Sequence, residues 1–256
     1  MIKEDIKFQD STVFEGMTSI RAILKAKDDG LDTRNIKKIL YAADKMKNIY
    51  KEVGYLKAVS EKYGYEVVET TSEEIEKIAL GTSHKGIVAI SDDRVIPMLT
   101  EDVEIAENGF YCMIQGIEDP YNFGYSLRSL YACGCTGIIL PERNWMSAAG
   151  VVARSSAGAS EMFPIFTADP IVAADIFKKR GYTIVCAEEK TENILGKCEL
   201  KLPILLIVGG EKRGISRALM DKADMLVKIQ YAKEFKASLS AASATTMFAY
   251  EIMRQN

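Results

Sequence analysis

No apolar run in the sequence approaches the length of a membrane span, which takes about 20 consecutive apolar residues. The first ten residues, MIKEDIKFQD, are too polar for a signal peptide. We therefore expect a cytoplasmic protein without a membrane partner. A chain of 256 residues allows one or two domains, each with a core of its own.

The pattern of a zinc site is missing as well. Five cysteines occur, but the only close pair is Cys133 and Cys135, and no second pair follows that could complete a four-ligand site. Reduced thiols suit a cytoplasmic protein. We therefore predict that this pair is buried, and we expect no metal.

Two common nucleotide-binding signatures are also absent. The stretch IVGGEKRGIS (207–216) matches the phosphate-binding pattern G-x-x-x-x-G-K-[ST] except at the lysine, where Ile215 stands. That lysine reaches the terminal phosphates, so an ATPase is a poor interpretation. No G-x-G-x-x-G follows a strand, because ACGCTG (132–137) has the wrong spacing and precedes one. We therefore do not expect a cofactor to be bound in the way that a Rossmann fold binds one.

Net charge gives no general argument for nucleic acid, since the chain carries a formal charge of −3. Positive charge is nevertheless concentrated locally. Residues 201–256 hold nine basic against five acidic residues, and Arg34, Lys37 and Lys38 lie close together in the sequence. Such a cluster is usually a solvated face. A surface that contacts phosphates is the alternative.

The first hundred residues alternate helical and strand patterns. Residues 15–30 have the apolar spacing of a helix, and a second helix is expected from about Asp44. A third helix at 71–80 would be capped by Thr71 or Ser72. Strands are expected at 37–43, 65–70 and 85–91.

Residues 109–256 alternate more regularly. Apolar runs that predict strands occur at 110–117, 137–140, 163–166, 182–187, 203–208 and 225–229, and helical patterns separate nearly all of them before a long C-terminal helix. This alternation predicts an α/β fold with a parallel sheet covered on both faces. The acidic, proline-containing stretch before it indicates a connection. We therefore expect domains at 1–95 and 109–256, joined by a linker at 96–108.

Three stretches of the second domain carry a resemblance to a known family. IEDPYNFGYSLRSLYACGCTGIIL (117–140) is similar to a D-P-x-N-x-G-x-x-x-R motif, LLIVGGEKRGIS (205–216) to a V-G-x-E-x-x-G-[IL]-S loop, and VKIQYAKEFKASLSAASATTMFAYE (227–251) to a Ser-Leu-Asn segment with an alanine-rich helix. RSSAGASE (154–161) resembles the small-residue stretch between the first two. In this order, the motifs resemble those of the SpoU (TrmH-like) RNA ribose 2′-O-methyltransferases of the SPOUT superfamily.

The resemblance implies a fold, a cofactor and an assembly. The second domain would be a SPOUT α/β-knot, a deep trefoil knot with a mostly parallel sheet that binds S-adenosylmethionine, and members act as homodimers through it. FEGMTSIRAIL and SHKGIVAI in the first domain are similar to a smaller ribosomal-protein-L30e-like α/β domain that binds substrate RNA. The implied activity is methylation of a ribose 2′-hydroxyl of RNA. The favoured substrate is ribosomal RNA, in the course of its processing, rather than transfer RNA.

The motif positions imply the site residues. The catalytic candidates are Asn122, Arg128, Glu211, Ser238 and Ser240, and the cofactor-binding candidates are Val208, Gly209, Gly210, Glu211, Gly214, Ile229, Ser238 and Leu239. The candidate RNA contacts are Arg34, Lys37, Lys38, His84, Lys85 and Arg128. The glycines would let the main chain approach a ligand and adopt positive φ, while Ile229 and Leu239 would wall the adenine.

Individual roles stay open at several positions. Family proposals make Arg128 the base that acts on the 2′-hydroxyl, but a guanidinium almost never loses its proton at neutral pH. The alternative is a bidentate clamp on the adjacent phosphate. Asn122 would position groups in its loop or cap the following helix, and Glu211 would orient Arg128 or a loop. His84, the only histidine, is expected to be structural or RNA-facing.

The third motif departs from the family pattern. Ser238, Leu239 and Ser240 stand where the family has Ser-Leu-Asn. A serine hydroxyl is shorter than an asparagine amide and offers fewer donors. Either Ser240 keeps a reduced form of the contact, or the substrate geometry differs. An RNA-binding protein of this fold without methyl transfer, or a transfer-RNA enzyme, is therefore the alternative function.

Overall fold

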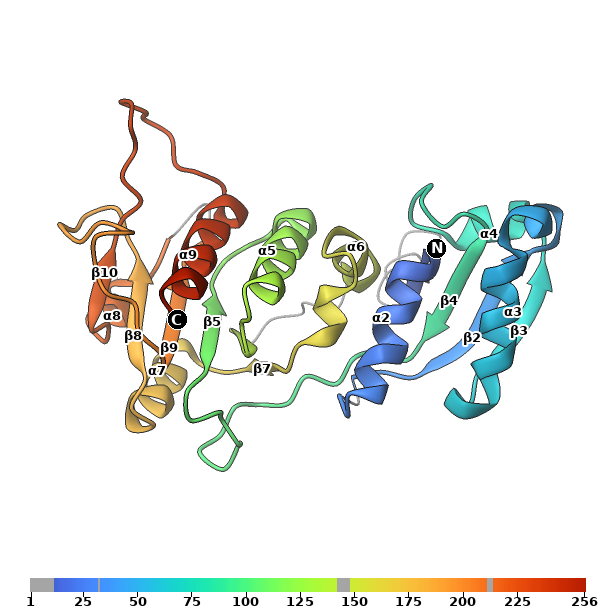
Figure 1. Ribbon diagram of the computed structural model, residues 1–256, viewed down its shortest axis with the longest axis horizontal. Coiled ribbons are helices and arrows are strands. Elements are labelled where there is room, and N and C mark those ends of the chain that lie inside the picture. The colour runs from blue at the N-terminus through green and yellow to red at the C-terminus, as the bar shows by residue number, and fades with distance from the viewer. Residues whose placement is uncertain (1–11, 32, 142–147, 211–213) are drawn as a thin grey trace, which may run out of the picture. The chain divides into compact units, whose positions relative to one another are not determined.

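The computed structural model of this chain describes residues 12–31, 33–141, 148–210 and 214–256. It consists of two compact units, each with its own β-sheet (Figure 1). Of the described residues, 12–95 and 148–162 form the first unit and the others form the second. The division after residue 95 lies where the sequence analysis drew it. Residues 148–162, drawn in the second domain, pack with the first unit instead.

The first unit is built on a mixed sheet of four strands in the order β1-β4-β2-β3. These are β1 (Val13–Glu15), β2 (Ile36–Ala42), β3 (Glu66–Thr70) and β4 (Ile87–Ser91). β2 runs parallel to β3 and antiparallel to β4, which also pairs antiparallel with β1. The helical elements are α2 (Gly16–Asp28), the 3-10 turn η1 (Ala43–Lys45), α3 (Met46–Tyr63) and α4 (Ser72–Ile78). The expected helices and strands are present, and β1 was not predicted.

Local sequence signals explain where these elements end. The apolar stripes of α2 and α3 pack on the sheet through Ile20, Ile23, Leu24, Ile49, Val53 and Leu56. Gly64, with φ at +73°, stops α3 in the left-handed region that favours glycine. The hydroxyl of Thr71 accepts a hydrogen bond from the Glu74 N–H at 3.3 Å, so Thr71 rather than Ser72 caps α4.

Small residues explain how 148–162 pack in the first unit. This segment forms α6 (Ala149–Ser155) and the 3-10 turn η3 (Ala159–Met162). A Cβ at Gly150 would lie 2.2 Å from the Val13 carbonyl oxygen, and one at Gly158 would lie 2.5 Å from the Ala22 Cβ. Side chains at these positions would collide with β1 and α2. The small-residue stretch therefore serves close packing.

The second unit contains a six-stranded sheet in the order β10-β8-β9-β5-β6-β7, and all of its pairings are parallel. The strands are β5 (Phe110–Ile114), β6 (Gly137–Leu140), β7 (Ile165–Thr167), β8 (Thr183–Ala187), β9 (Ile204–Val208) and β10 (Met225–Val227). Each coincides with one of the six apolar runs found in the sequence, and only β7 extends past its run, by one residue to Thr167. The predicted parallel sheet is confirmed.

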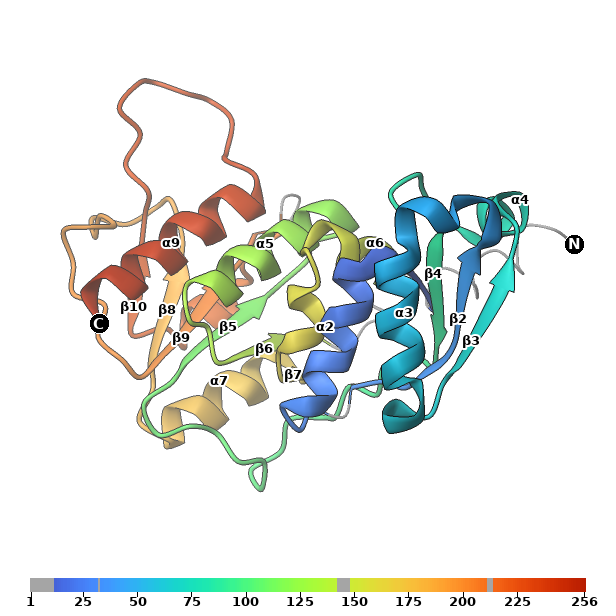
Figure 2. The ribbon, with the colours of Figure 1, turned by 45° about the vertical axis from the view of Figure 1, so that its right-hand side comes forward.

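Successive side chains of a strand point to opposite faces of the sheet. Because the strands of this sheet are almost entirely apolar, both faces need to be covered, and helices cover them. The helices are α5 (Pro120–Ala132), α7 (Pro170–Lys179), α8 (Arg217–Met220) and α9 (Ala241–Gln255). Tyr111, Met113 and Leu205 share one core cluster with Phe177 of α7. α5 and α9 lie side by side in both ribbon views (Figures 1 and 2). No helix in the described ranges is long and apolar enough to cross a membrane.

The strand order creates a point where connections diverge. β5 lies between β9 and β6, so the chain runs from β5 toward β7 on one side and later returns on the other side to β8, β9 and β10. Open parallel sheets bind ligands beyond the carboxyl ends of strands at such a point.

Candidate functional site

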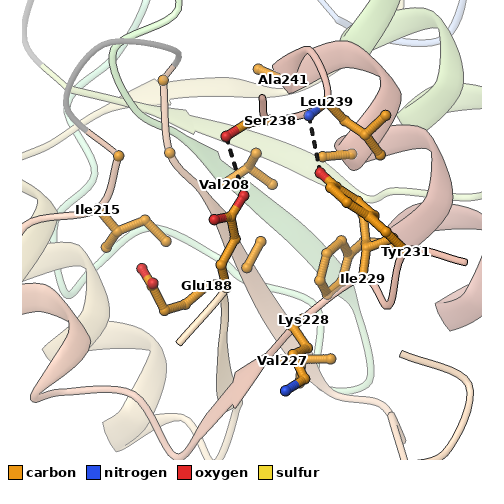
Figure 3. A pocket seen from close by; sticks show the side chains of 17 residues that line it. Glu188, Val208, Ile215, Val227, Lys228, Ile229, Tyr231, Ser238, Leu239 and Ala241 are labelled. Atoms are coloured by element: carbon orange, nitrogen blue, oxygen red, sulfur yellow. Dashed lines mark hydrogen bonds between the residues drawn. The ribbon is translucent and has the colours of Figure 1, made fainter. Parts of the chain in front are cut away.

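A cavity of about 300 Å³ opens at the carboxyl ends of β8, β9 and β10 (Figure 3). It is lined by Ala187, Glu188, Glu189, Val208, Gly209, Gly210, Gly214, Ile215, Val227, Lys228, Ile229, Tyr231, Ser238, Leu239, Ala241, Ala244 and Phe248. The walls therefore come from three strand-end loops and from the start of α9. These segments are distant in the sequence, and the parallel sheet brings them together.

The cavity collects most of the cofactor-binding candidates drawn from the sequence. Val208, Gly209, Gly210, Gly214, Ile229, Ser238 and Leu239 all line it. Glu211, the remaining candidate, lies outside the described residues. Ile215 is buried and also lines the wall, at the position where a phosphate-binding loop would need its lysine.

The glycines of this loop allow main chain to touch main chain. A Cβ at Gly209 would lie 2.6 Å from the carbonyl carbon of Gly214, and one at Gly210 would lie 2.2 Å from the carbonyl oxygen of Gly116. Gly214 itself has φ at +60°, where other residues are strained. Its N–H donates to the Gly210 carbonyl at 3.1 Å. Glycine is thus required here for backbone packing.

Two hydrogen bonds fix the segment that closes one side of the cavity. The Tyr231 hydroxyl accepts from the Leu239 N–H at 3.1 Å, and the Ser238 hydroxyl donates to the Glu189 carboxylate at 3.1 Å. Figure 3 shows Tyr231 and Leu239 on the side opposite Ile215. The first bond therefore joins the two ends of segment 231–239, and the second attaches its C-terminal end to Glu189.

The sequence reasoning missed four polar residues of the cavity, Glu188, Glu189, Lys228 and Tyr231. The two glutamates directly follow β8, at the carboxyl end of a parallel strand. An acidic pair at that position was a usable signal. Tyr231 carries no comparable pattern.

The first motif is placed on α5, outside the cavity. Asp119 caps this helix by accepting from the N–H groups of Tyr121 and Asn122, each at 3.2 Å. The alternative that Asn122 is the helix cap is therefore wrong. Asn122 is half-buried, whereas Arg128 is exposed on the same helix. Neither side chain lines the cavity.

Ser240 also lies outside the cavity lining. Its hydroxyl accepts from the Ser243 N–H at 3.2 Å and caps α9. Serine suits this position because its short hydroxyl reaches the free N–H groups of a first helical turn. Where the family motif has asparagine, this chain has a helix cap.

The candidate RNA contacts divide by exposure. Lys37 and Lys85 are exposed and Lys38 is half-buried. Arg34 is buried, and its Nε donates to the Glu161 carboxylate at 2.8 Å. His84 is buried too, with its Nδ1 accepting from the Gly86 N–H at 3.1 Å. The expectation that Arg34 and His84 touch RNA is corrected: both are committed to the interior of the first unit.

Three of the five cysteines, Cys112, Cys135 and Cys186, are buried thiols. Burial raises the pKa of Cys112 and of Cys135 above the usual thiol range, since a thiolate is disfavoured away from water. Cys133 is only half-buried, unlike the prediction for the pair. In the described part of the chain, no group of three or more His, Cys, Asp or Glu residues could hold a metal ion.

Comparison with known proteins shows which family the chain belongs to. Residues 109–250 match the model of the SpoU rRNA Methylase family. YacO of Bacillus subtilis (strain 168), named as a TrmH family tRNA/rRNA methyltransferase, is 26% identical over 202 residues, which cover 77% of this chain and 80% of that protein.

Two solved structures share the fold. The AdoMet-bound rRNA methyltransferase from Sinorhizobium meliloti superposes with a TM-score of 0.77 at 23% identity, covering 99% of this chain and 94% of that one. An RNA 2′-O ribose methyltransferase superposes with a TM-score of 0.74 at 19% identity, covering 95% and 88%. At this level of identity the likeness establishes the SPOUT-type α/β fold. The family model spans more than half of the chain. The protein therefore belongs to the SpoU rRNA methylase family.

Proposed function

We propose that this chain transfers a methyl group from S-adenosylmethionine to a ribose 2′-hydroxyl of RNA, with ribosomal RNA favoured over transfer RNA. The observation that carries the proposal is the cavity, because its walls are the second and third motif segments. The matched family supports a methyltransferase that acts on RNA. Two proteins of this fold, one described with AdoMet and one as a 2′-O ribose enzyme, support the donor and the acceptor.

The cavity suits the methyl donor in size and chemistry. Its volume of about 300 Å³ is at the lower end of the range for small-molecule sites. Ile229, Leu239 and Phe248 offer an apolar wall for an adenine ring, and Glu188 and Glu189 place negative charge beside a cationic ligand. When bound, S-adenosylmethionine supplies a methyl group on a positively charged sulfur, which a hydroxyl oxygen can accept.

We attribute the shape of the cavity to a trefoil knot. The loops after β5 and β9 meet at Gly116 and Gly210, and a Cβ at Gly210 would lie 2.2 Å from the carbonyl oxygen of Gly116. Backbone contact of this kind is what the threading of one loop past another requires.

Because Arg128 does not line the cavity, we propose that it acts across a homodimer. It lies three residues after the exposed Tyr125 on α5, and thus on the same helix face. The neighbouring α9 exposes Met247, Tyr250 and Met253. Exposed apolar side chains on two adjacent helices suit a protein interface. A two-fold dimer through α5 and α9 would place Arg128 at the interface, within reach of the partner subunit's cavity.

At that position Arg128 can hold the phosphate next to the target ribose through two parallel hydrogen bonds. A fixed guanidinium also stabilises negative charge that develops on the 2′-oxygen. A role as base is disfavoured because the guanidinium keeps its proton. The first unit would also contact the RNA, through Lys37, Lys38 and Lys85.

One experiment tests the function directly. Calorimetry measures the binding of S-adenosylmethionine, and the purified protein is then incubated with the labelled donor and RNA from cells that lack the protein. We expect donor binding and a new 2′-O-methyl mark in ribosomal RNA, located by its resistance to alkaline cleavage. A methyl group on a base, or a mark confined to transfer RNA, would contradict the respective part of the proposal.

A second candidate, an RNA-binding protein without methyl transfer, is favoured by one observation. Ser240, at the position of the family asparagine, is used as a helix cap. That candidate predicts weak or absent binding of the methyl donor, which the same calorimetry measures.

A further inference from the structure

The chain between β10 and α9 forms a projecting arm, defined here as residues 230–237 (Figures 1 and 2). It contains no helix or strand. Lys233, Glu234, Phe235 and Lys236 are all exposed, and Phe235 is 60% exposed. The arm therefore offers an exposed aromatic ring beside two cations to a ligand.

The arm borders a hollow of its own. This hollow has a volume of about 310 Å³ and is lined by Glu189, Lys228, Ile229, Gln230, Tyr231, Phe235, Lys236 and Ala237. Glu189, Lys228, Ile229 and Tyr231 also line the main cavity. The hollow and the cavity therefore share a wall, so a ligand in the hollow would lie next to the methyl donor.

The base of the arm is anchored while its tip reaches into solvent. Tyr231 is held by the Leu239 N–H, and the Gln230 amide oxygen accepts from the Lys197 ammonium at 3.4 Å. The rings of Tyr231 and Phe235 have centroids 6.2 Å apart and are tilted by 59°, so they do not stack on each other. The Phe235 face is thus open to a flat partner.

We propose that the arm binds an unpaired nucleotide of the RNA substrate, adjacent in the strand to the nucleotide that is methylated. Phe235 stacks on its base, and Lys233 and Lys236 contact the neighbouring phosphates. Aromatic faces combined with positive charge are the elements by which proteins hold single-stranded nucleic acid. Residues 228–237 contain three lysines and one glutamate, so this stretch carries net positive charge that is complementary to the RNA phosphates. This inference rests on the proposed function, since it places the arm beside the site of transfer.

The test measures binding of a fluorescein-labelled 10-nucleotide single-stranded RNA by fluorescence anisotropy. Stacking of one base contributes about 1–3 kcal/mol, so Phe235→Ala should weaken binding by roughly 5- to 150-fold. Phe235→Trp should retain affinity, and its fluorescence should be quenched by the RNA beyond the change that Trp145 gives in the unaltered protein. Lys233→Gln with Lys236→Gln should reduce the slope of log K against log salt by about 1.4.

Lys178→Gln with Lys179→Gln is the charge-matched control. Both lysines are exposed on α7, outside the arm and the cavity, so the RNA affinity and the slope should change little. Equal RNA affinity of Phe235→Ala and the unaltered protein would overturn the inference. It would also be overturned if Phe235→Ala lost affinity for S-adenosylmethionine instead, because the arm would then be a cover for the donor.

Failure of the proposed function has a different signature. If the unaltered protein binds the RNA in a Phe235-dependent way but transfers no methyl group, the arm stands as an RNA contact and the enzymatic assignment falls. If methyl transfer proceeds normally in Phe235→Ala with unchanged RNA affinity, the enzyme stands and the arm inference falls.

Discussion

Gly210 is the residue at which the loop after β9 has least freedom to change. Any side chain there would meet backbone atoms of Gly116, which cannot rotate away as a flexible side chain can. We expect Gly210→Ala to displace the loop and to weaken binding of S-adenosylmethionine by at least about tenfold, or 1.4 kcal/mol. Calorimetry measures the affinity.

Gly54 provides the matched control. It lies inside α3 with nothing within 4 Å of an added Cβ and without positive φ. Gly54→Ala should leave donor binding unchanged and raise the stability of the protein by up to about 1 kcal/mol through helix propensity. If Gly210→Ala bound the donor as tightly as Gly54→Ala, the close approach would not be needed for the site.

Glu161 is a buried counter-charge in the first unit. Its carboxylate accepts from the Arg34 Nε, and both side chains are at most 2% exposed. Burial lowers the pKa of the nearby Arg94, and Glu161 opposes that shift. Glu161→Gln should therefore lower the free energy of unfolding by about 3–5 kcal/mol, because it leaves buried guanidinium charge without its carboxylate. Urea unfolding measures the loss.

The control for Glu161 is a surface pair. Glu73 is exposed and lies 3.3 Å from the Lys77 ammonium one helical turn away. Glu73→Gln should change stability by no more than about 0.5 kcal/mol. An equally small effect of Glu161→Gln would show that the buried pair does not contribute as its geometry indicates.

At the residue scale, the sequence predicted the cavity lining better than the charged surface. The glycine loop and the Ser238–Leu239 pair could be placed because the resemblance gives them fixed positions in a motif. Arg34 could not, since its partner Glu161 is 127 residues away in the chain. A cluster of basic residues looks the same in sequence whether it faces water or a buried carboxylate.

At the scale of elements, periodicity was sufficient for all six strands of the second sheet. They are near-continuous apolar runs, as expected for strands buried on both faces. The three-residue β1 was missed because so short a segment shows no alternation. Residues 148–162 were assigned to the wrong unit because small residues do not reveal which surface they pack against.

The C-terminal helix α9 carries a pH-sensitive attachment. The Arg254 guanidinium and the Gln255 amide hold the pKa of Glu251 at about 2 by hydrogen bonding to its carboxylate. Gln255 also donates to the Cys198 carbonyl at 3.1 Å and accepts from the Leu200 N–H at 2.7 Å. The ionised Glu251 therefore helps to fix α9, which supplies part of the cavity wall.

The sign of the pH effect follows from that lowered pKa. Folding favours the ionised form, so the stabilisation is complete above the ordinary glutamate pKa of about 4.3 and is lost as pH falls toward 2. We expect Glu251→Gln to be less stable than the unaltered protein at pH 6, and the difference to vanish near pH 2. Urea unfolding at several pH values measures it. A gap that did not change with pH would show that the charge of Glu251 is not what matters.

At the scale of the whole molecule, α9 supplies part of the cavity wall, and Arg128 lies outside the cavity on the neighbouring helix α5. The Ser129 hydroxyl accepts from Thr246 at 2.6 Å, which ties the two helices into one surface. Tyr125, Met247 and Tyr250 are exposed on that surface. In the proposed homodimer, a two-fold contact there would bury these side chains and would give each subunit an arginine from its partner.

Mixing two inactive variants tests that arrangement. Arg128→Ala removes the arginine, and Ala244→Phe fills the cavity that Ala244 lines. If Arg128 serves the partner subunit's cavity, a heterodimer has one complete site, because the intact cavity of one subunit meets the intact arginine of the other. After random reassortment half of the dimers are mixed, so an equimolar mixture should recover about a quarter of the unaltered activity. If Arg128 served its own subunit, every site in the mixture would lack one component, and no activity would return when methyl transfer to RNA is measured.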